Sequence, residues 1–422
     1  MRTILLLVGF LVLACPWTLI AQTISLDAYL DLIRSQHPFF RQEALAHKIE
    51  LKRQERIRGD EDWVTVVRPS YIYNDVVDVG FGSVDQFDNA RLEAGMGREI
   101  WKTGGHIDFL YEFNFRAQDV NESRIVFPGQ GDVDISGPSR FFRTGVSASY
   151  TQPLLQNRGG GLSRLAYELQ GYTAEQTDLF VQENQEGFLL EQALRFMDWI
   201  RRDQQLEIAR QRLELAEEEL NSTRRKLEAR IVEEVDVFRA KDAALEAKRN
   251  VRLVESFWKA RQAELAVQAQ EKSLLASSPK YDLYRLRQLP DPERTVSNLR
   301  KRARILRQLG RRHDQLKRER EGLSDLEKSE LNLVFSAGLK DGESDVDEAV
   351  QFNQPDATIA LEYRYPLGNR TARADVQRNA LELNRIESQI EDAALALESQ
   401  ARSMLTQLSE LEGVLALGTP LN

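Results

Sequence analysis

The chain has 422 residues, of which 57 are basic and 66 acidic, so its formal net charge is −9. An acidic balance argues against a surface that coats nucleic acid, and we expect no nucleic-acid partner. The single cysteine, Cys15, excludes intramolecular disulfides and cysteine-based metal clusters. No stretch after residue 22 approaches the roughly 20 apolar residues of a membrane-spanning helix, which excludes a bundle of membrane helices.

Residues 1–21 have the features of an export signal peptide. Arg2 gives a positive start, Ile4 to Leu13 form an apolar run, and Ala21 precedes a polar residue. The stretch ending at Cys15 also resembles a bacterial lipobox, in which Cys15 would be lipidated. Because the residues after Cys15 stay apolar, removal of this cysteine with the signal is the favoured interpretation.

Helical and then strand periodicity follow the signal. Residues 22–62 are expected to form N-terminal helices, with a break at His37-Pro38. Residues 63–153 are expected to form a first group of strands with long exposed loops. From His106 to Arg116 the apolar residues occupy alternate positions, and a Gly-Gly turn before them predicts a hairpin. The polar stretch 118–138 is expected to be a long exposed loop.

Residues 162–277 are expected to form a long helical hairpin of coiled-coil type. Leucines recur every seven residues along its first arm, with small residues three positions on, and a similar repeat follows a tip near residues 230–236. The recurring leucines are Leu206, Leu213, Leu220 and Leu227. Small residues let helices approach closely, which favours a cylinder of several helices over a two-stranded rope.

The same plan then restarts. Residues 278–330 are expected to be a linker and a helix, residues 331–366 a second strand hairpin, and residues 370–417 a helix. The strand-to-helix junctions around Pro153 and Pro366 are similar, with TQPLLQNR at the first and RYPLGNR at the second. The expected fold class is therefore α+β, built as an internally duplicated helix-strands-helix unit.

No catalytic or metal-binding constellation emerges from the sequence. The four histidines, His37, His47, His106 and His313, are scattered without metal-ligand spacing. The triple glycine at 159–161 lacks the Lys-Ser/Thr of a phosphate loop and is interpreted as a flexible turn. We expect no enzyme activity, no cofactor and no metal site.

The repeated strand ends and the hairpin tip together resemble the TolC-type outer-membrane efflux protein family, the outer-membrane factors. From Arg230 to Ala240, RIVEEVDVFRA is similar to the family pattern of Gly, two apolar residues, a short spacer, Asp-Val and Ala. The resemblance implies a homotrimer in which each chain gives four strands to one outer-membrane β-barrel, continued by a long periplasmic α-helical barrel. It also implies that a periplasmic adaptor protein and an inner-membrane pump dock at the helical tips.

Two groups of candidate functional residues follow. Strand positions on the polar side would line the barrel lumen, because closure between chains removes sheet edges and turns the apolar side to outer-membrane lipid. These candidates are Asp108, Glu112, Asn114, Glu362 and Arg364. The alternative for them is the solvent-facing side of a soluble sheet.

The second group lies at the tip and consists of the candidate adaptor contacts Arg230, Glu233, Glu234 and Asp236. The alternative for this group is a merely solvated turn. Arg230 stands where the family has Gly, so we expect the turn to be capped differently.

The second repeat is shorter than the first. Only 56 residues follow Pro366, against about 124 that the first repeat spends on its hairpin after Pro153. We therefore expect the second helical hairpin to be truncated, without its tip and return helix.

The expected function is the exit duct of a tripartite efflux or type I secretion system. Such a duct would sit in the outer membrane of a Gram-negative-type bacterium, with its helical part in the periplasm. The alternative is a periplasmic adaptor or a structural coiled-coil protein of an envelope complex. The repeated strand pair favours the duct, because an adaptor would carry one hairpin beside a lipoyl-like domain.

Overall fold

The computed structural model describes residues 23–75, 84–120, 124–127, 131–134, 137–282 and 288–418. The expected signal peptide and Cys15 lie outside these residues. The chain divides into two compact units. One comprises residues up to Leu45 together with Val181–Leu289, and the other comprises Ala46–Phe180 together with the residues from Pro290 onward.

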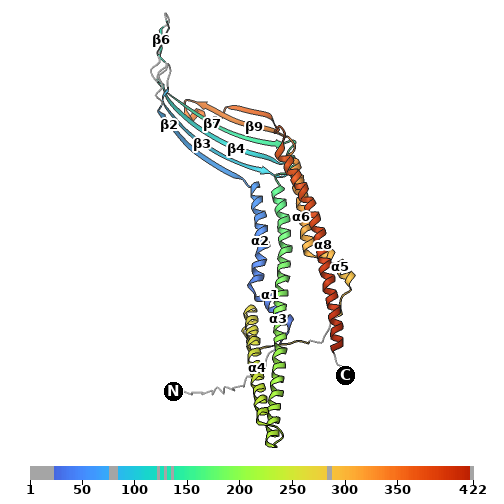
Figure 1. Cartoon of the computed structure of the whole chain (residues 1–422). Coiled ribbons are helices and arrows are strands. Elements are labelled where there is room, and N and C mark those ends of the chain that lie inside the picture. Colours follow the sequence, from blue (N-terminus) through green and yellow to red (C-terminus); the bar gives the residue numbers. More distant parts are fainter. Residues whose placement is uncertain are drawn as a thin grey trace, which may run out of the picture. The chain divides into compact units, whose positions relative to one another are not determined.

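A six-stranded antiparallel sheet dominates the second unit, with the strand order β10-β9-β7-β4-β3-β2. Figure 1 shows these strands curving together. The strands are β2 (Val64–Asp75), β3 (Val84–Ile100), β4 (Gly105–Val120), β7 (Gly137–Pro153), β9 (Glu330–Glu343) and β10 (Gln354–Arg364). Sequence neighbours pair as hairpins, whereas β7 and β9 pair across a long helical insertion. The resemblance implied four strands, and the sheet has six.

Register gives the sheet one apolar and one polar face. Continuous ladders connect Met96, Phe109, Ala148, Ala337 and Ala357 in one row. The adjacent row points to the opposite face and contains Gly97, Asp108, Ser149, Ser336 and Thr358. The alternation seen in the sequence therefore continues across all the central strands.

The segment expected to be a loop, residues 118–138, is not a loop throughout. β4 extends to Val120, β7 begins at Gly137, and a two-stranded pair of β5 (Arg124–Phe127) and β6 (Gly131–Asp134) lies between them. The loop prediction was wrong here because strands of four residues are too short to show a period of two.

A short helix, α7 (Val346–Ala349), packs against β7 and β9 at one end of the apolar face. The Thr144 hydroxyl is buried and donates to the Ala349 carbonyl. Asp341, also buried, accepts from the Gly342 and Asn353 backbone N–H groups at 2.9 and 3.3 Å. The polar groups at this end of the apolar face are thus covered and paired.

The second unit also contains the end of α2 (Pro38–Arg58), the start of α3 (Leu165–Glu228) and the helices α5 (Pro292–Arg302), α6 (Arg304–Leu326) and α8 (Arg370–Gly418). α6 and α8 pack together through a buried cluster of Leu316, Leu383 and Ile386. Ion pairs at 2.6 Å from Arg300 to Glu398 and at 2.8 Å from Arg402 to Glu293 connect α5 to α8. Residues 278–330 thus contain two helices, where the sequence predicted one.

The first unit contains α1 (Leu26–Gln36), the start of α2 (Pro38–Arg58), most of α3 (Leu165–Glu228) and α4 (Glu234–Gln268). The expected break at His37-Pro38 separates α1 from α2. Two short strands, β1 (Thr23–Ile24) and β8 (Ser278–Pro279), pair in parallel. The core residues are Tyr29, Ile33, Phe196, Trp199, Ile200, Leu265, Ala266, Ala269 and Leu274.

α3 and α4 form the expected hairpin, with its turn at residues 229–233 (Figure 1). The seam positions that the heptad pattern predicted are the shielded ones, with Leu206, Ala209 and Thr223 buried. The return helix ends at Gln268, earlier than the expected 277, and a 3₁₀ turn follows at Lys272–Ala276. Leu274 in that turn still packs into the core, which is why the apolar pattern outlasts the helix.

Among the described residues, no helix is at once long and apolar enough to cross a membrane.

Candidate functional site

The five predicted lumen residues lie on one face of the sheet. Asp108, Glu112 and Asn114 alternate along β4, and the ladders bring Glu362 and Arg364 of β10 to the same face. Strands far apart in sequence are therefore brought together on a single polar surface.

Ion pairs of the described strands lie on this polar face. His106 Nε2 is 2.9 Å from Asp108, and Lys340 Nζ is 2.7 Å from Asp356. The guanidinium of Arg91 contacts Glu112. These side chains are about half exposed, so each pair contributes little to stability, on the order of 0–1 kcal/mol. The face is best described as a hydrated surface of mixed charge.

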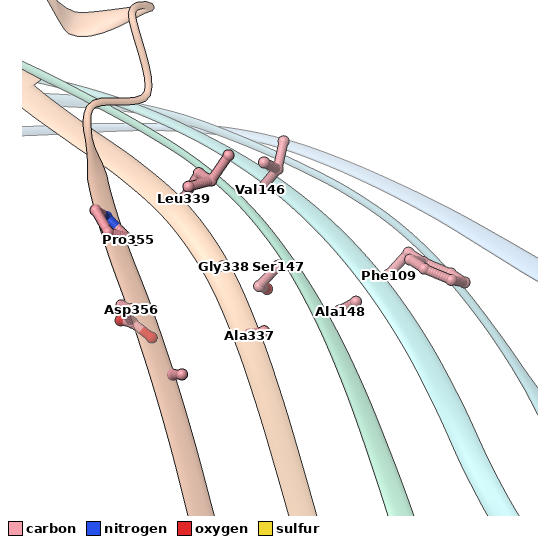
Figure 2. Close-up of a pocket in the computed structure, with 10 residues that line it drawn as sticks. Phe109, Val146, Ser147, Ala148, Ala337, Gly338, Leu339, Pro355 and Asp356 are labelled. Carbon is pink, nitrogen blue, oxygen red and sulfur yellow. The ribbon is translucent and has the colours of Figure 1, made fainter.

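The opposite face is apolar and exposed. Phe335, Ile359 and Leu361 expose 46%, 73% and 67% of their surface in the single chain. A shallow hollow lies on this face where small side chains, Ala148 and Ala337 among them, meet the larger Phe109 (Figure 2). Monomeric soluble proteins rarely expose contiguous apolar surface on this scale, so this face requires a covering.

The tip of the hairpin has a defined geometry. Arg230 has φ +59°, the left-handed conformation, and its N–H donates to the Leu227 carbonyl at 2.8 Å. The next N–H, of Ile231, donates to the Lys226 carbonyl at 2.8 Å. These two bonds are the Schellman motif that ends many helices, usually with Gly at the left-handed position. The expectation of a different cap was wrong, because the helix ends in an ordinary Schellman motif. The departure is that Arg230 occupies the position where Gly is usual.

The acidic tip residues have different roles. Asp236 accepts from the Glu233 backbone N–H at 3.3 Å and so caps the first turn of α4. Glu233 and Glu234 have exposed side chains at the same helix start. Glu233 is the N-cap of α4, and its side chain accepts from the Asp236 backbone N–H, so these two residues form a capping box. Asp236 and Glu233 are therefore structural residues first, and Glu234 is the better candidate for a partner contact.

Sequence reasoning missed an apolar patch at the tip. Ile231 exposes 71% of its surface, and Val235 and Phe238 are also exposed. Three apolar residues in and just after a polar turn were the signal that could have found it. Exposed apolar residues beside exposed carboxylates suit a protein partner better than a solvated turn does.

The histidines make ordinary polar contacts. His37 Nε2 lies 3.2 Å from Gln268 Oε1, and His47 Nδ1 lies 3.1 Å from the Ala174 carbonyl. Within the described part of the chain, no group of three or more His, Cys, Asp or Glu residues is placed to hold a metal ion.

Comparison with known proteins finds likeness in structure. No family model and no curated protein matches the sequence. The outer-membrane channel OprN matches with a TM-score of 0.61 at 12% identity, over 93% of this chain and 75% of that one. CusC matches at 0.59 and 10%, over 93% and 77%. The CmeC outer membrane channel of Campylobacter jejuni matches at 0.57 and 10%, over 93% and 73%.

The chain has the fold of the TolC-type outer-membrane channels. The likeness extends over sheet and helices alike, since it covers nearly the whole chain. The resemblance seen in the strand junctions and the tip is thus confirmed at the level of fold.

Proposed function

We propose that the chain is an outer-membrane channel, the exit duct through which an efflux or type I secretion system passes its substrate to the exterior. The observation that carries this proposal is the sheet with one exposed apolar face and one charged face. Lipid would cover the first face, and water in a passage would hydrate the second.

The size of the apolar face supports a membrane setting. On β4 it runs from Ile107 to Ala117, and ten residue steps of about 3.3 Å give about 33 Å along the strand. At the strand tilt of about 35–45° found in outer-membrane barrels, this length corresponds to a height of about 23–27 Å, close to their apolar band of about 25 Å. The ladders place Thr144 and Asp341 on the row of Phe113, within this band, where α7 packs and the polar groups of both residues are paired.

The same proposal covers assembly and partners. A homotrimer would close the sheets into one barrel, with Asp108, Glu112, Asn114, Glu362 and Arg364 in its lumen. The long helices would form the periplasmic part. A periplasmic adaptor protein, itself bound to an inner-membrane pump, would dock at the hairpin tip on Glu234 and the neighbouring apolar patch.

Internal duplication belongs to this proposal as well. The two strand-to-helix junctions each carry an asparagine in the left-handed region, Asn157 at φ 58° and Asn369 at φ 39°. Both side chains also make hydrogen bonds near the junctions: Asn157 Oδ1 accepts from Leu162 N at 2.9 Å, and Asn369 Nδ2 donates to the Glu327 carbonyl at 3.1 Å. A shared backbone conformation at matching sequence supports a common origin of the two halves.

Two adjacent residues on β9 offer a matched test. Phe335→Arg places a charge on the apolar face, at an expected cost of about 2–4 kcal/mol near the bilayer midplane. Ser336→Arg places the same charge on the polar face, beside Ser149 and Thr358. We expect the first variant to be lost from the outer-membrane fraction. We expect the second to be retained there, with the ion selectivity of its conductance shifted toward anions.

Membrane fractionation measures how much of each variant reaches the outer membrane, and planar-bilayer recording measures the ion selectivity of its conductance. Equal membrane levels for both, or loss of the Ser336 variant alone, would contradict the assignment of the two faces.

A further inference from the structure

The sheet has two free edges that match each other. Within the described residues, β2 and β10 each pair with one neighbour only. Every pairing in the sheet is antiparallel, so with six strands β2 and β10 run in opposite directions. If copies of this sheet are placed side by side, β10 of one is therefore antiparallel to β2 of the next.

The strands of this sheet are staggered along their length, as closure of a sheet into a barrel requires. The ladders carry Val64, the first residue of β2, across to Thr358 on β10. β10 continues six residues beyond that row, to Arg364. Pairing Val64 with Arg364 of the next copy gives a shift of six residues, about 20 Å, whereas pairing Arg68 with Glu362 gives a shift of eight residues, about 26 Å. Because six strands at about 4.8 Å span about 29 Å, these shifts correspond to strand tilts of about 35° and about 42°. Closed barrels have tilts of about 35–45°.

Face matching restricts how the two edges can meet. A shift by one residue would turn the apolar side of one strand to the polar side of the other, so only alternate registers are acceptable. Two of these pair ten or more residues of β2 and β10. One places Arg68 opposite Glu362. The other places Val66 opposite Glu362 and Val64 opposite Arg364, which leaves both charges facing valines.

We propose that β10 of one copy pairs with β2 of a second copy, with Arg68 opposite Glu362 and Val67 opposite Tyr363. This inference rests on the proposed function and specifies the partner and the register of its barrel. Three copies would contribute eighteen strands, a number at which barrels enclose an aqueous channel. The chain would thus form a wider barrel than the four strands per chain first expected.

Charge and backbone both fit this seam. Arg68 is 71% exposed and has Glu93 at 3.9 Å on its own sheet, so it can also reach a carboxylate across the seam. Pro69 and Pro355 each remove one donor from a free edge. In the proposed register Pro69 faces Leu361 and Pro355 faces Asp75, so no position of the seam lacks both donors.

Paired cysteines test the register in whole cells. Antiparallel Cα separations of 4.5–5.5 Å fall within the range for disulfides, so opposite cysteines should oxidise readily. We expect Val67→Cys with Tyr363→Cys to link chains into a closed ring of three. Val67→Cys with Leu361→Cys, which belongs to the other register, should link several-fold less. Val67→Cys with Ala94→Cys is the control, because those residues are partners within one sheet.

A charge exchange gives a second measurement. Arg68→Glu and Glu362→Arg should each reduce detergent-resistant oligomers, and the double variant should restore them. Stronger linking at 67 and 361, or no linking at 67 and 363 while the control links, overturns the register. Linked rings of another size overturn the eighteen-strand count. A wild-type chain absent from the outer membrane overturns the proposed function and this inference together, whereas an outer-membrane chain that conducts without the seam overturns the inference alone.

Discussion

Arg230 at the helical tip carries a backbone cost that glycine would not. Its φ of +59° places it in the left-handed region, which costs a non-glycine residue roughly 1–2 kcal/mol. The side chain is exposed, so little packing would be lost on its removal. We predict that Arg230→Gly raises the free energy of unfolding by about 1 kcal/mol, whereas Arg230→Val lowers it.

Urea unfolding of the full chain, followed by circular dichroism, measures both variants. A lower midpoint for Arg230→Gly would contradict the strain assigned to the tip. It would also indicate that the guanidinium stabilises the turn by a contact of its own.

The carboxylate of Asp198 links the two arms of the hairpin by hydrogen bonds. Its Oδ2 accepts from Arg202 Nε at 2.8 Å on α3 and from Arg261 Nε at 2.9 Å on α4. Burial alone would raise the pKa of Asp198, but hydrogen bonds from Arg202 and Arg201 and the charge of Arg261 outweigh it and lower the pKa to about 2. The ordinary value is 3.8, so folding favours the charged carboxylate.

The sign of the pH dependence follows. A depressed pKa contributes stability that is complete above about pH 4 and disappears as the pH falls toward 2. We predict that the hairpin loses about 1–2 kcal/mol from this group over that window, and that Asp198→Asn removes this part of the pH dependence. Thermal unfolding midpoints between pH 2 and 6, compared for the two proteins, check it. Parallel curves would contradict the role of Asp198.

At the scale of elements, the start of α4 separates two roles of negative charge. Asp236 caps the helix, so Asp236→Lys is expected to destabilise it by about 1 kcal/mol through loss of the cap. Glu233 is the N-cap of α4, and its side chain accepts from the Asp236 backbone N–H to complete the capping box, so it is left unchanged. We predict that Glu234→Lys keeps its oligomers, at a cost below about 1 kcal/mol near the helix start, but loses export, because a partner no longer binds the tip.

Drug resistance in an efflux-deficient host and photo-crosslinking from position 231, which is exposed at the tip, measure this loss. Unchanged resistance and unchanged crosslinking in the Glu234→Lys variant would contradict a partner contact and indicate that the tip is a solvated turn.

Elements with a long repeating pattern could be predicted from the sequence. β4 and β9 showed period two because one face of each is apolar and the other hydrated. The leucine heptads of α3 marked a seam that the structure buries at Leu206 and Ala209. Shorter elements could not be found this way: β1, β5, β6 and β8 have two to four residues each and derive their stability from pairing partners.

Candidate residues in the long periodic elements could likewise be placed from the sequence, whereas the roles of those in the short tip turn could not. The lumen set was placed on one face correctly, because parity along a strand determines the face. The roles at the tip could not be separated from sequence, because the cap made by Asp236 depends on where α4 begins. The six strands could be located from the sequence, but their order in one sheet could not: β7 pairs with β9 across more than 170 residues, and no local pattern encodes that pairing.

At the scale of the whole molecule, the sheet of a single chain is incomplete. Among the described strands, β2 and β10 each have an unpaired edge, and the apolar face of the sheet is exposed. The proposed closure of several copies in lipid would pair these edges and cover that face. The measurement that tests this most directly is planar-bilayer recording of the oligomer extracted from outer membranes. We predict stepwise currents from a heat-sensitive oligomer that fractionates with the outer membrane. Recovery of the chain as a soluble single copy that adds no current to the bilayer would contradict the channel.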